Sequence, residues 1–195
     1  MAFALSTFKS NLSGGGAKSA LFHVELQFPA ILSTSDPLPP FIDSEPLPID
    51  SKFLISAASI PASTVATYDI FYHGKSIKVA ADRTYESTWD TTIINDEDFA
   101  IRKKIEDWMK LLSNHELNTR DKRVTTGNGV NKEGKNAAYK QDLIVRQHSK
   151  SGSILESYKF LGAFPTTLST IALSWESSTI ETYTCGWTYD CWKRL

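Results

Sequence analysis

Histidine, cysteine and serine are the residues of this chain most able to bind a metal or attack a substrate, and their spacing supports neither activity. The four histidines stand far apart, and none belongs to a spaced metal-binding pair or adjoins a candidate nucleophile. No serine occupies the Gly-x-Ser-x-Gly elbow of hydrolases, and neither cysteine has an evident base beside it. We therefore predict a protein that is not an enzyme and binds no cofactor, in which four histidines serve as surface or strand-packing residues: His23, His73, His115 and His148.

The two cysteines, Cys185 and Cys191, lie in a segment of regular alternation. Between residues 182 and 191, aromatic and cysteine side chains alternate with threonine, glycine and aspartate, which is the pattern of one strand. Within such a strand the two thiols would be roughly 20 Å apart, well beyond the ~7 Å that a disulfide allows between Cα atoms. We expect two unpaired structural thiols, buried on one face of a single strand.

The acidic sequence Asn-Asp-Glu-Asp at residues 95–98 could in principle bind a cation, because paired aspartates open many calcium loops. A calcium loop that began at Asp96 would need glycine at its sixth position and glutamate at its twelfth. Those positions hold Ile101 and Asp107. We therefore predict no metal site, and interpret the cluster as the start of a helix.

A strand precedes this cluster and a helix follows it. Trp89, Thr91 and Ile93 alternate with polar residues, which is typical of a strand with one buried face. Asn95 can accept a hydrogen bond from a free amide of the first helical turn, and the acids after it favour the positive end of the helix dipole. The sequence thus predicts a helix over about residues 96–112, docked on the core by an apolar stripe: Ile101, Ile105, Trp108, Met109 and Leu112.

Composition indicates a globular protein without an obvious electrostatic partner. The chain has 195 residues, of which 41% are hydrophobic, enough for one domain with a substantial core. Its 21 basic and 22 acidic side chains nearly cancel, which argues against a dedicated nucleic-acid or membrane-surface binder. No apolar run approaches the ~20 residues needed to span a bilayer, and no signal peptide is evident. We expect a cytosol-like compartment.

Three segments interrupt the regular elements of this single domain, which we assign to residues 1–195. Residues 1–20 are interpreted as a flexible leader. Residues 33–51 contain five prolines and acidic but no basic side chains, which predicts an extended acidic loop. Residues 113–137 are rich in glycine and asparagine, and this is the most basic region of the chain.

The remaining segments predict strands. A His-Gly turn at residues 73–74 joins two of them into a hairpin. A set of strands that mostly follow one another in the chain favours a mainly β protein, either an antiparallel barrel or two packed sheets with one docked helix. Besides the strand before the helix, the expected strands cover residues 21–28, 53–60, 67–73, 76–81, 142–148, 154–162, 170–175 and 179–192.

Four segments, taken in order, resemble the tail tube proteins of contractile-tailed, T4-like bacteriophages. The most specific parts are the Ala-Asp-Arg-Thr-Tyr to Asp-Trp run, the Tyr-Lys to Ile-Val-Arg-Gln segment, the Phe-Pro-Thr turn at residues 164–166 and the closing aromatic strand. Each is weak alone, but the ordered set is specific and covers most of the chain. The segments are residues 19–28, 79–112, 137–152 and 158–192.

The resemblance implies a β-barrel-like structural subunit of the virion tail, assembled in the cytoplasm of the host bacterium. Members of this family form hexameric rings that stack into a hollow tube inside a contractile sheath, and this tube is the path of the genome into the host. The implied partners are further copies of the chain, the tail sheath protein, and baseplate and tail terminator proteins. DNA would pass through without specific binding, and no membrane is involved.

Two other functions remain open on the sequence. A baseplate or tube-initiating component of the same tail would share the tube domain, although the chain has no sizeable extra domain. An eight-stranded barrel can also hold a small apolar ligand, which would predict a monomer with an internal cavity.

The basic loop is a candidate for contact between rings. Open axial stacking needs heterologous contacts between the top of one ring and the bottom of the next. We hypothesise that residues 118–137 contact an acidic surface of an adjacent ring through Arg120, Lys122 and Arg123. This loop and the span 33–51 look longer than in compact members of the family, so the family's contacts cannot be carried over to them.

The closing segment is a candidate for the lining of the bore. Basic side chains there would hold DNA phosphates through counterion release, so a neutral or acidic bore is expected. Residues 166–192 contain Glu176, Glu181 and Asp190 and no lysine or arginine. The polar face of this segment is therefore predicted to face the bore.

Overall fold

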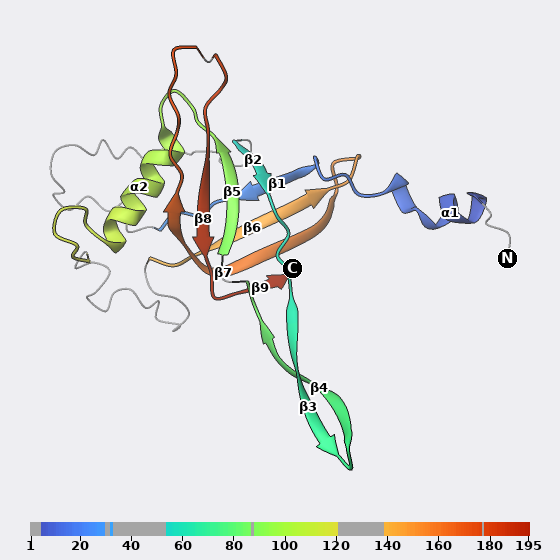
Figure 1. The fold of residues 1–195 in the computed structure, drawn as a ribbon. Coiled ribbons are helices and arrows are strands. Elements are labelled where there is room, and N and C mark those ends of the chain that lie inside the picture. The colour runs from blue at the N-terminus through green and yellow to red at the C-terminus, as the bar shows by residue number, and fades with distance from the viewer. Residues whose placement is uncertain (1–4, 30–31, 33–53, 87, 121–138, 177) are drawn as a thin grey trace.

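The computed structural model describes residues 5–29, 32, 54–86, 88–120, 139–176 and 178–195 (Figure 1). The predicted Pro-rich loop at residues 33–51 and most of the basic loop at 113–137 lie outside these ranges. The helical elements are α1 (Leu5–Asn11), the 3-10 turn η1 (Ser13–Gly15) and α2 (Ala100–Leu112). The strands are β1 (Phe22–Glu25), β2 (Ile55–Ala58), β3 (Thr64–Tyr72), β4 (Lys75–Thr84), β5 (Thr88–Ile94), β6 (Gln141–His148), β7 (Ile154–Leu168), β8 (Thr182–Thr188) and β9 (Cys191–Arg194).

The main sheet is antiparallel and follows the order β1-β6-β7-β8-β5-β2, with β9 added beside β7. β7 changes partners along its length: its first half pairs with β6 and β9, and its last residues pair with β8. Gly162 lies between the two halves with φ 66°, a left-handed conformation that suits glycine. Because β7 belongs to two differently directed layers, the sheet curls until β1 and β2 approach each other. The predicted mainly β fold with one docked helix is confirmed.

The core lies between the curled sheet and α2. Trp89 stacks on Phe160 with ring centroids 4.3 Å apart, and Trp108 of α2 meets Trp187 of β8 at 5.8 Å. The Trp108 indole also donates a hydrogen bond to the Tyr139 carbonyl oxygen at 2.8 Å, so its polar atom is satisfied although the ring is fully buried. Large aromatic side chains thus make up much of the core between the sheet and the helix.

The helix starts later than predicted, and Asn95 does not cap it. The Asn95 amide still bonds to the Glu181 carbonyl as an extension of β5 pairing, and its side chain donates to the Glu181 carboxylate at 2.9 Å. The chain then turns over Asp96 to Phe99, and Phe99 has a left-handed φ of 55°. The Asp96 carboxylate accepts the amide hydrogen of Ala100 at 3.0 Å and so takes the predicted capping role.

The apolar stripe of α2 agrees with the predicted one except at its end. Ile101, Ile105 and Trp108 are fully buried. Leu111 continues the buried face, whereas Met109 and Leu112 are only partly buried and pack against the edge of the core. At 3.6 residues per turn both leucines lie beside Trp108, and only the contacts of the folded chain decide which is covered.

The single closing strand predicted for residues 179–192 is two strands. β8 ends at Thr188, the chain turns at Tyr189 and Asp190, and β9 returns to pair with β7. The two cysteines therefore lie on different strands, although both are unpaired as predicted. In the sequence, the alternation of aromatic and polar residues continues through this turn, because aromatic side chains on both sides of the turn reach the core.

Two further segments differ from the prediction. Residues 170–175 form no strand, because they belong to the connection between β7 and β8 and have no strand partner. Residues 1–20, interpreted as a flexible leader, contain the short helix α1. Among the described residues, no helix is long and apolar enough to cross a membrane.

Candidate assembly surfaces

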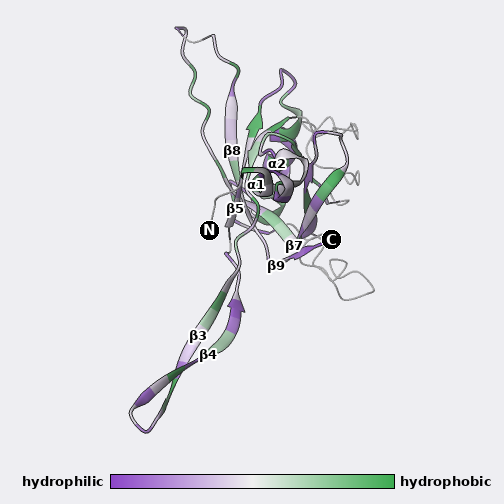
Figure 2. Ribbon diagram, turned by 90° about the vertical axis from the view of Figure 1, so that its right-hand side faces the viewer, coloured by the Kyte–Doolittle hydropathy of each residue, from purple (hydrophilic) through white to green (hydrophobic). Residues whose placement is uncertain are grey.

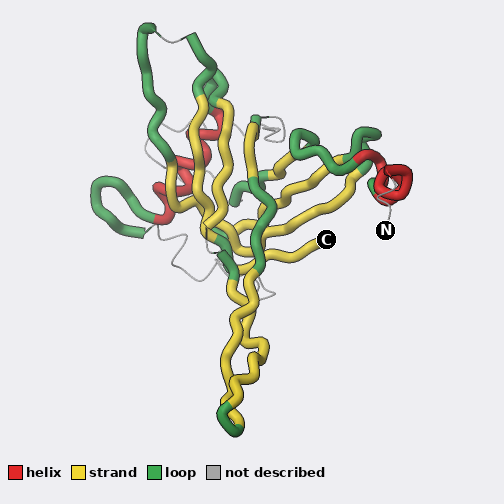
Figure 3. The backbone as a smooth tube through the Cα atoms, turned by 45° about the vertical axis from the view of Figure 1, so that its right-hand side comes forward, coloured by secondary structure: helices red, strands yellow, loops and turns green. Residues whose placement is uncertain are grey.

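The hairpin of β3 and β4 projects away from the body of the subunit (Figures 1 and 3). His73 and Gly74 join the strands with φ angles of 45° and 77°, so both turn residues are left-handed, as a tight primed turn requires. This confirms the predicted hairpin at residues 73–74. The sequence did not reveal that both strands lie outside the main sheet.

One face of the hairpin is apolar. Tyr68 pairs with Val79 and Ile70 pairs with Ile77, so these side chains share a face with Tyr72 by the period of a strand. Tyr68, Ile70 and Ile77 are each about half exposed, at 50%, 47% and 53%. Figure 2 shows hydrophobic stretches in both strands, beyond the body of the subunit.

The opposite face of the hairpin is more polar: it has an ion pair between Asp69 and Lys78 at 3.1 Å, and its one exposed aromatic side chain is Phe71. A two-stranded hairpin is only marginally stable in water unless its apolar face is covered. An exposed apolar face of this kind marks an interaction site. We therefore treat the face formed by Tyr68, Ile70, Tyr72, Ile77 and Val79 as a candidate assembly surface, the hairpin face.

The connection between β7 and β8, residues 169–181, projects from the opposite end of the subunit (Figures 1, 2 and 3). Three of its four large apolar side chains are exposed: Leu173 at 81%, Trp175 completely and Ile180 at 75%. The fourth, Ile171, is partly buried and packs against the core. Glu176 lies in the turn at its tip, and the connection contains no basic residue. We call this second candidate surface the β7–β8 loop.

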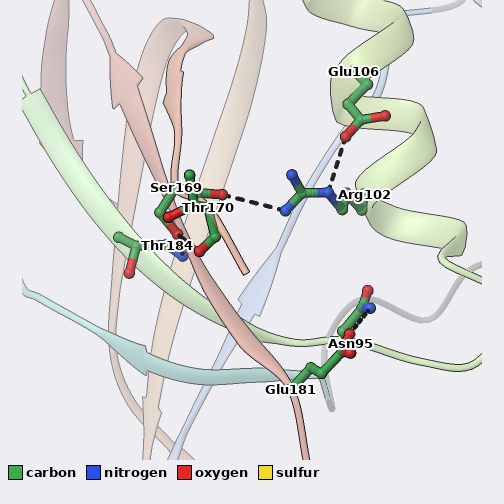
Figure 4. A network of polar contacts seen from close by, with 7 residues as sticks. All are labelled: Asn95, Arg102, Glu106, Ser169, Thr170, Glu181 and Thr184. Carbon is green, nitrogen blue, oxygen red and sulfur yellow. Dashed lines mark hydrogen bonds and ion pairs between the residues drawn. The ribbon is translucent and has the colours of Figure 1, made fainter. Parts of the chain in front are cut away.

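Polar contacts tie the base of the β7–β8 loop to the body (Figure 4). The Ser169 carbonyl accepts a hydrogen bond from Arg102 of α2 at 3.3 Å, and the Ser169 hydroxyl accepts one from the Thr184 amide at 2.9 Å. On the other side of the base, Asn95 holds Glu181. The loop is therefore anchored at both stems while its apolar tip remains in solvent.

The three predicted bore-lining acids do not share one surface. Glu176 is at the tip of the β7–β8 loop, and Glu181 pairs with Asn95 just before β8. Asp190 follows β8, about 20 Å of strand away, and forms an ion pair with Lys140 at 2.7 Å. Two of the three carboxylates are thus engaged within the subunit.

Threonines cover the outward face of β8 and its neighbours. Tyr183, Cys185 and Trp187 point to the core, so the alternate positions of β8 point away from it. At Gly186 the strand can carry no side chain, because an added Cβ would lie 2.2 Å from the Thr167 hydroxyl. The outward face has one acid, Asp90, one isoleucine, Ile94, and seven threonines: Thr88, Thr92, Thr166, Thr167, Thr182, Thr184 and Thr188.

The predicted inter-ring residues are only partly described. Arg120 is exposed at the end of the segment after α2. Lys122 and Arg123 lie outside the described residues. The structure therefore gives no geometry for a surface made by these three side chains.

The described residues contain no group of three or more His, Cys, Asp or Glu side chains placed to hold a metal ion. Burial raises the pKa of the Cys185 thiol, so this residue is an unreactive neutral thiol, as the prediction of a structural cysteine requires. A polar contact that no sequence pattern predicts joins His23 and His148, which form a 2.6 Å hydrogen bond across the β1–β6 pairing. Only the strand pairing brings them together, because they are 125 residues apart.

Comparisons with known proteins agree with this architecture. The chain is 27% identical to the tail tube protein gp19 of Enterobacteria phage T4 over 183 residues, which cover 93% of each chain. Two solved structures share its fold. The tube terminating cap of the anti-feeding prophage matches with a TM-score of 0.56 and 15% identity over 92% of this chain and 90% of that one. A chain of the sheath-tube complex of an extracellular contractile injection system, in the extended state, matches with a TM-score of 0.51 and 14% identity over 100% of this chain and 99% of that one.

The sequence pattern of a protein family, described as "Phage tail tube protein", matches residues 17–195 of the chain. This match includes every strand of the main sheet, α2, the hairpin and the β7–β8 loop. It also agrees with the prediction of a structural, non-enzymatic protein. The chain therefore belongs to the phage tail tube protein family.

Proposed function

We propose that this tail tube protein forms hexameric rings, which stack into the inner tube of a contractile tail and enclose the path of the genome. The observation that carries this proposal is the exposure of apolar side chains on two projections at opposite ends of the subunit. A subunit that ends in apolar surfaces in both axial directions is suited to open stacking, because different surfaces meet at each junction.

Ring closure would use the edges of the main sheet. Among the described residues, β1 pairs only with β6, and β2 pairs only with β5. Each edge strand leaves backbone groups available for a neighbour, which is a hazard for an isolated protein and an advantage for a ring subunit. Contact between subunits would cover these edges.

The threonine face is our candidate for the lining of the bore. It carries Asp90 and no lysine or arginine among its members, so it offers DNA phosphates no counterion-releasing contacts. The lining predicted from the sequence consisted of three carboxylates. The lining proposed from the structure is instead a mostly neutral surface of threonine hydroxyls, with one negative charge from Asp90. Substituting Thr184 with lysine would then slow DNA passage without blocking tube assembly.

The basic loop and the outer partners complete the proposal. Charge reversal at Arg120, Lys122 and Arg123 should shorten tubes if this loop meets an acidic surface on an adjacent ring. Because structural neighbours come from a sheath-tube complex and a tube terminating cap, we also propose contacts with a tail sheath protein and a tail terminator. A baseplate would be the remaining neighbour of the tube.

Electron microscopy of the purified protein tests the proposed function. Negative-stain images should show rings or hollow tubes, and light scattering should give a sixfold multiple of the 21.7 kDa subunit mass. A protein that stays monomeric under all conditions that favour assembly, including added tube ends from a related tail, would overturn the proposal.

A further inference from the structure

We infer that the β7–β8 loop of one subunit docks on the hairpin face of a subunit in the next ring. This inference rests on the proposed function, because it needs stacked rings. It names the two surfaces that meet at each junction, and the occupant of both is a second copy of this chain. Three properties of the surfaces support it: their positions, their apolar character and their charges.

The positions of the two surfaces suit a head-to-tail contact. The hairpin and the β7–β8 loop leave the body in opposite directions in all three views of the whole subunit (Figures 1, 2 and 3). When one subunit is placed above another in the same orientation, the loop of one points toward the hairpin of the other. Such a contact is heterologous and does not close on itself, so it can repeat along a tube.

The apolar side chains on both sides are of the kind that dominate interface energetics. Trp175 is completely exposed in the β7–β8 loop, so its own subunit covers none of its surface. The hairpin face offers aromatic and branched side chains, including Tyr68 and Ile70, in adjacent positions along two paired strands. A tryptophan packed on tyrosine and isoleucine is a typical interface anchor.

The charges near the two tips are opposite. Glu176 is the charged residue at the tip of the β7–β8 loop, whereas Glu181 is held by Asn95 at its base. The distal half of the hairpin carries Lys75 and Lys78, of which Lys78 is paired with Asp69. The loop is therefore acidic where the hairpin tip has a net positive charge, and this favours the orientation in which they meet.

A charge-swap experiment tests this contact. Glu176→Lys and Lys75→Glu should each leave rings intact but reduce the number of long tubes roughly tenfold, because the same repulsion recurs at every subunit of a ring. The double variant should restore tube growth. Glu116→Lys reverses an exposed acid elsewhere on the surface and serves as the control, with tube growth like that of the unaltered protein.

Each outcome decides the question. Tubes of normal length from both single variants, or a double variant that assembles no better than either single one, would overturn the docking. Neither result would affect the proposed function, which fails only if the unaltered chain forms no rings or tubes. A second test introduces cysteines as Ser174→Cys and Ile77→Cys, because Ile77 belongs to the hairpin face and is about half exposed. Covalent ladders on a non-reducing gel should form from tubes of this variant, whereas the pair Ser174→Cys and Ser153→Cys should remain uncrosslinked.

Discussion

Two regions of this subunit are built from the same kind of sequence and have opposite environments. In β5 and β8, alternating aromatic and β-branched residues bury one face under α2, so that Trp89, Trp187 and Ile93 are nearly inaccessible to solvent. In the hairpin, Tyr68 and Ile70 alternate with Thr67 and Asp69 in the same way, yet all nine residues of β3 are exposed. The comparison teaches that alternation identifies a face that must be covered, and not which chain covers it.

The two regions should therefore respond differently to substitution. Core positions determine whether the subunit folds, whereas hairpin and loop positions determine whether folded subunits associate. The free energy of unfolding of each variant is to be measured with a denaturant, at protein concentrations where light scattering reports monomers. This condition is needed because assembly itself would add concentration-dependent stability.

The largest effect is expected for Trp108→Ala. The substitution removes a fully buried ring that contacts Trp187, and it leaves the Tyr139 carbonyl without its indole donor. We expect the free energy of unfolding to fall by about 3–5 kcal/mol. Trp175→Ala is the matched control, since the same truncation at a completely exposed site should change the value by less than about 0.5 kcal/mol. If both variants lost the same free energy of unfolding, the proposed difference between core and projecting positions would be wrong.

A second test concerns the close approach of β5, β7 and β8. An added methyl at Gly186 would lie 2.2 Å from the Thr167 hydroxyl and 3.0 Å from a carboxylate oxygen of Asp90. We expect Gly186→Ala to destabilise the subunit by about 1–3 kcal/mol, because strands or side chains must shift. The second substitution Thr167→Ser, which keeps the hydroxyl but removes the methyl, should recover little of this loss, whereas Thr167→Gly should recover part of it.

Local rules predicted the strand β5, the burial of most of the α2 stripe and the hairpin turn. In each case the residues that carry the signal lie within one element, as with Ile101 and Ile105 or His73 and Gly74. The same rules missed the turn at Tyr189 and Asp190, because the alternation continues through it. They also predicted a strand at residues 170–175. The residue pattern of this segment is that of a strand, but in the folded chain no neighbouring strand pairs with it.

The candidate surfaces were predicted less well than the fold. The surfaces predicted from the sequence consist of charged residues, such as Arg120 and Glu181, because charge is evident from residue type alone. Glu181 is held by Asn95 inside its own subunit, and the exposed apolar side chains of the β7–β8 loop were assigned to a strand. Exposure depends on contacts between segments distant in the chain, so no local pattern could reveal it.

A smaller effect tests the corrected start of α2, which holds the helix over the core. Asp96→Ala removes the carboxylate that accepts the Ala100 amide and should cost about 1 kcal/mol of unfolding free energy. Asp98→Ala removes an exposed acid of the same cluster and should change the value by less than about 0.5 kcal/mol. If the Asp98 variant lost as much as the Asp96 variant, general helix-dipole electrostatics would explain the acidic cluster better than a specific cap.

The smallest effect on the monomer is expected at the hairpin, where the comparison makes its strongest claim. Ile70→Ser exchanges an apolar side chain that is already about half exposed, so the free energy of unfolding of the body should change by less than about 0.5 kcal/mol. The same variant should nevertheless lose most tube formation in electron micrographs, because the exchanged side chain belongs to the face that assembly would bury. Asp69→Asn alters the opposite face of the same strand and should assemble normally. A large loss of monomer stability in Ile70→Ser would instead mean that the hairpin is part of the subunit's own folding unit, since only intramolecular contacts can register in the unfolding of a monomer.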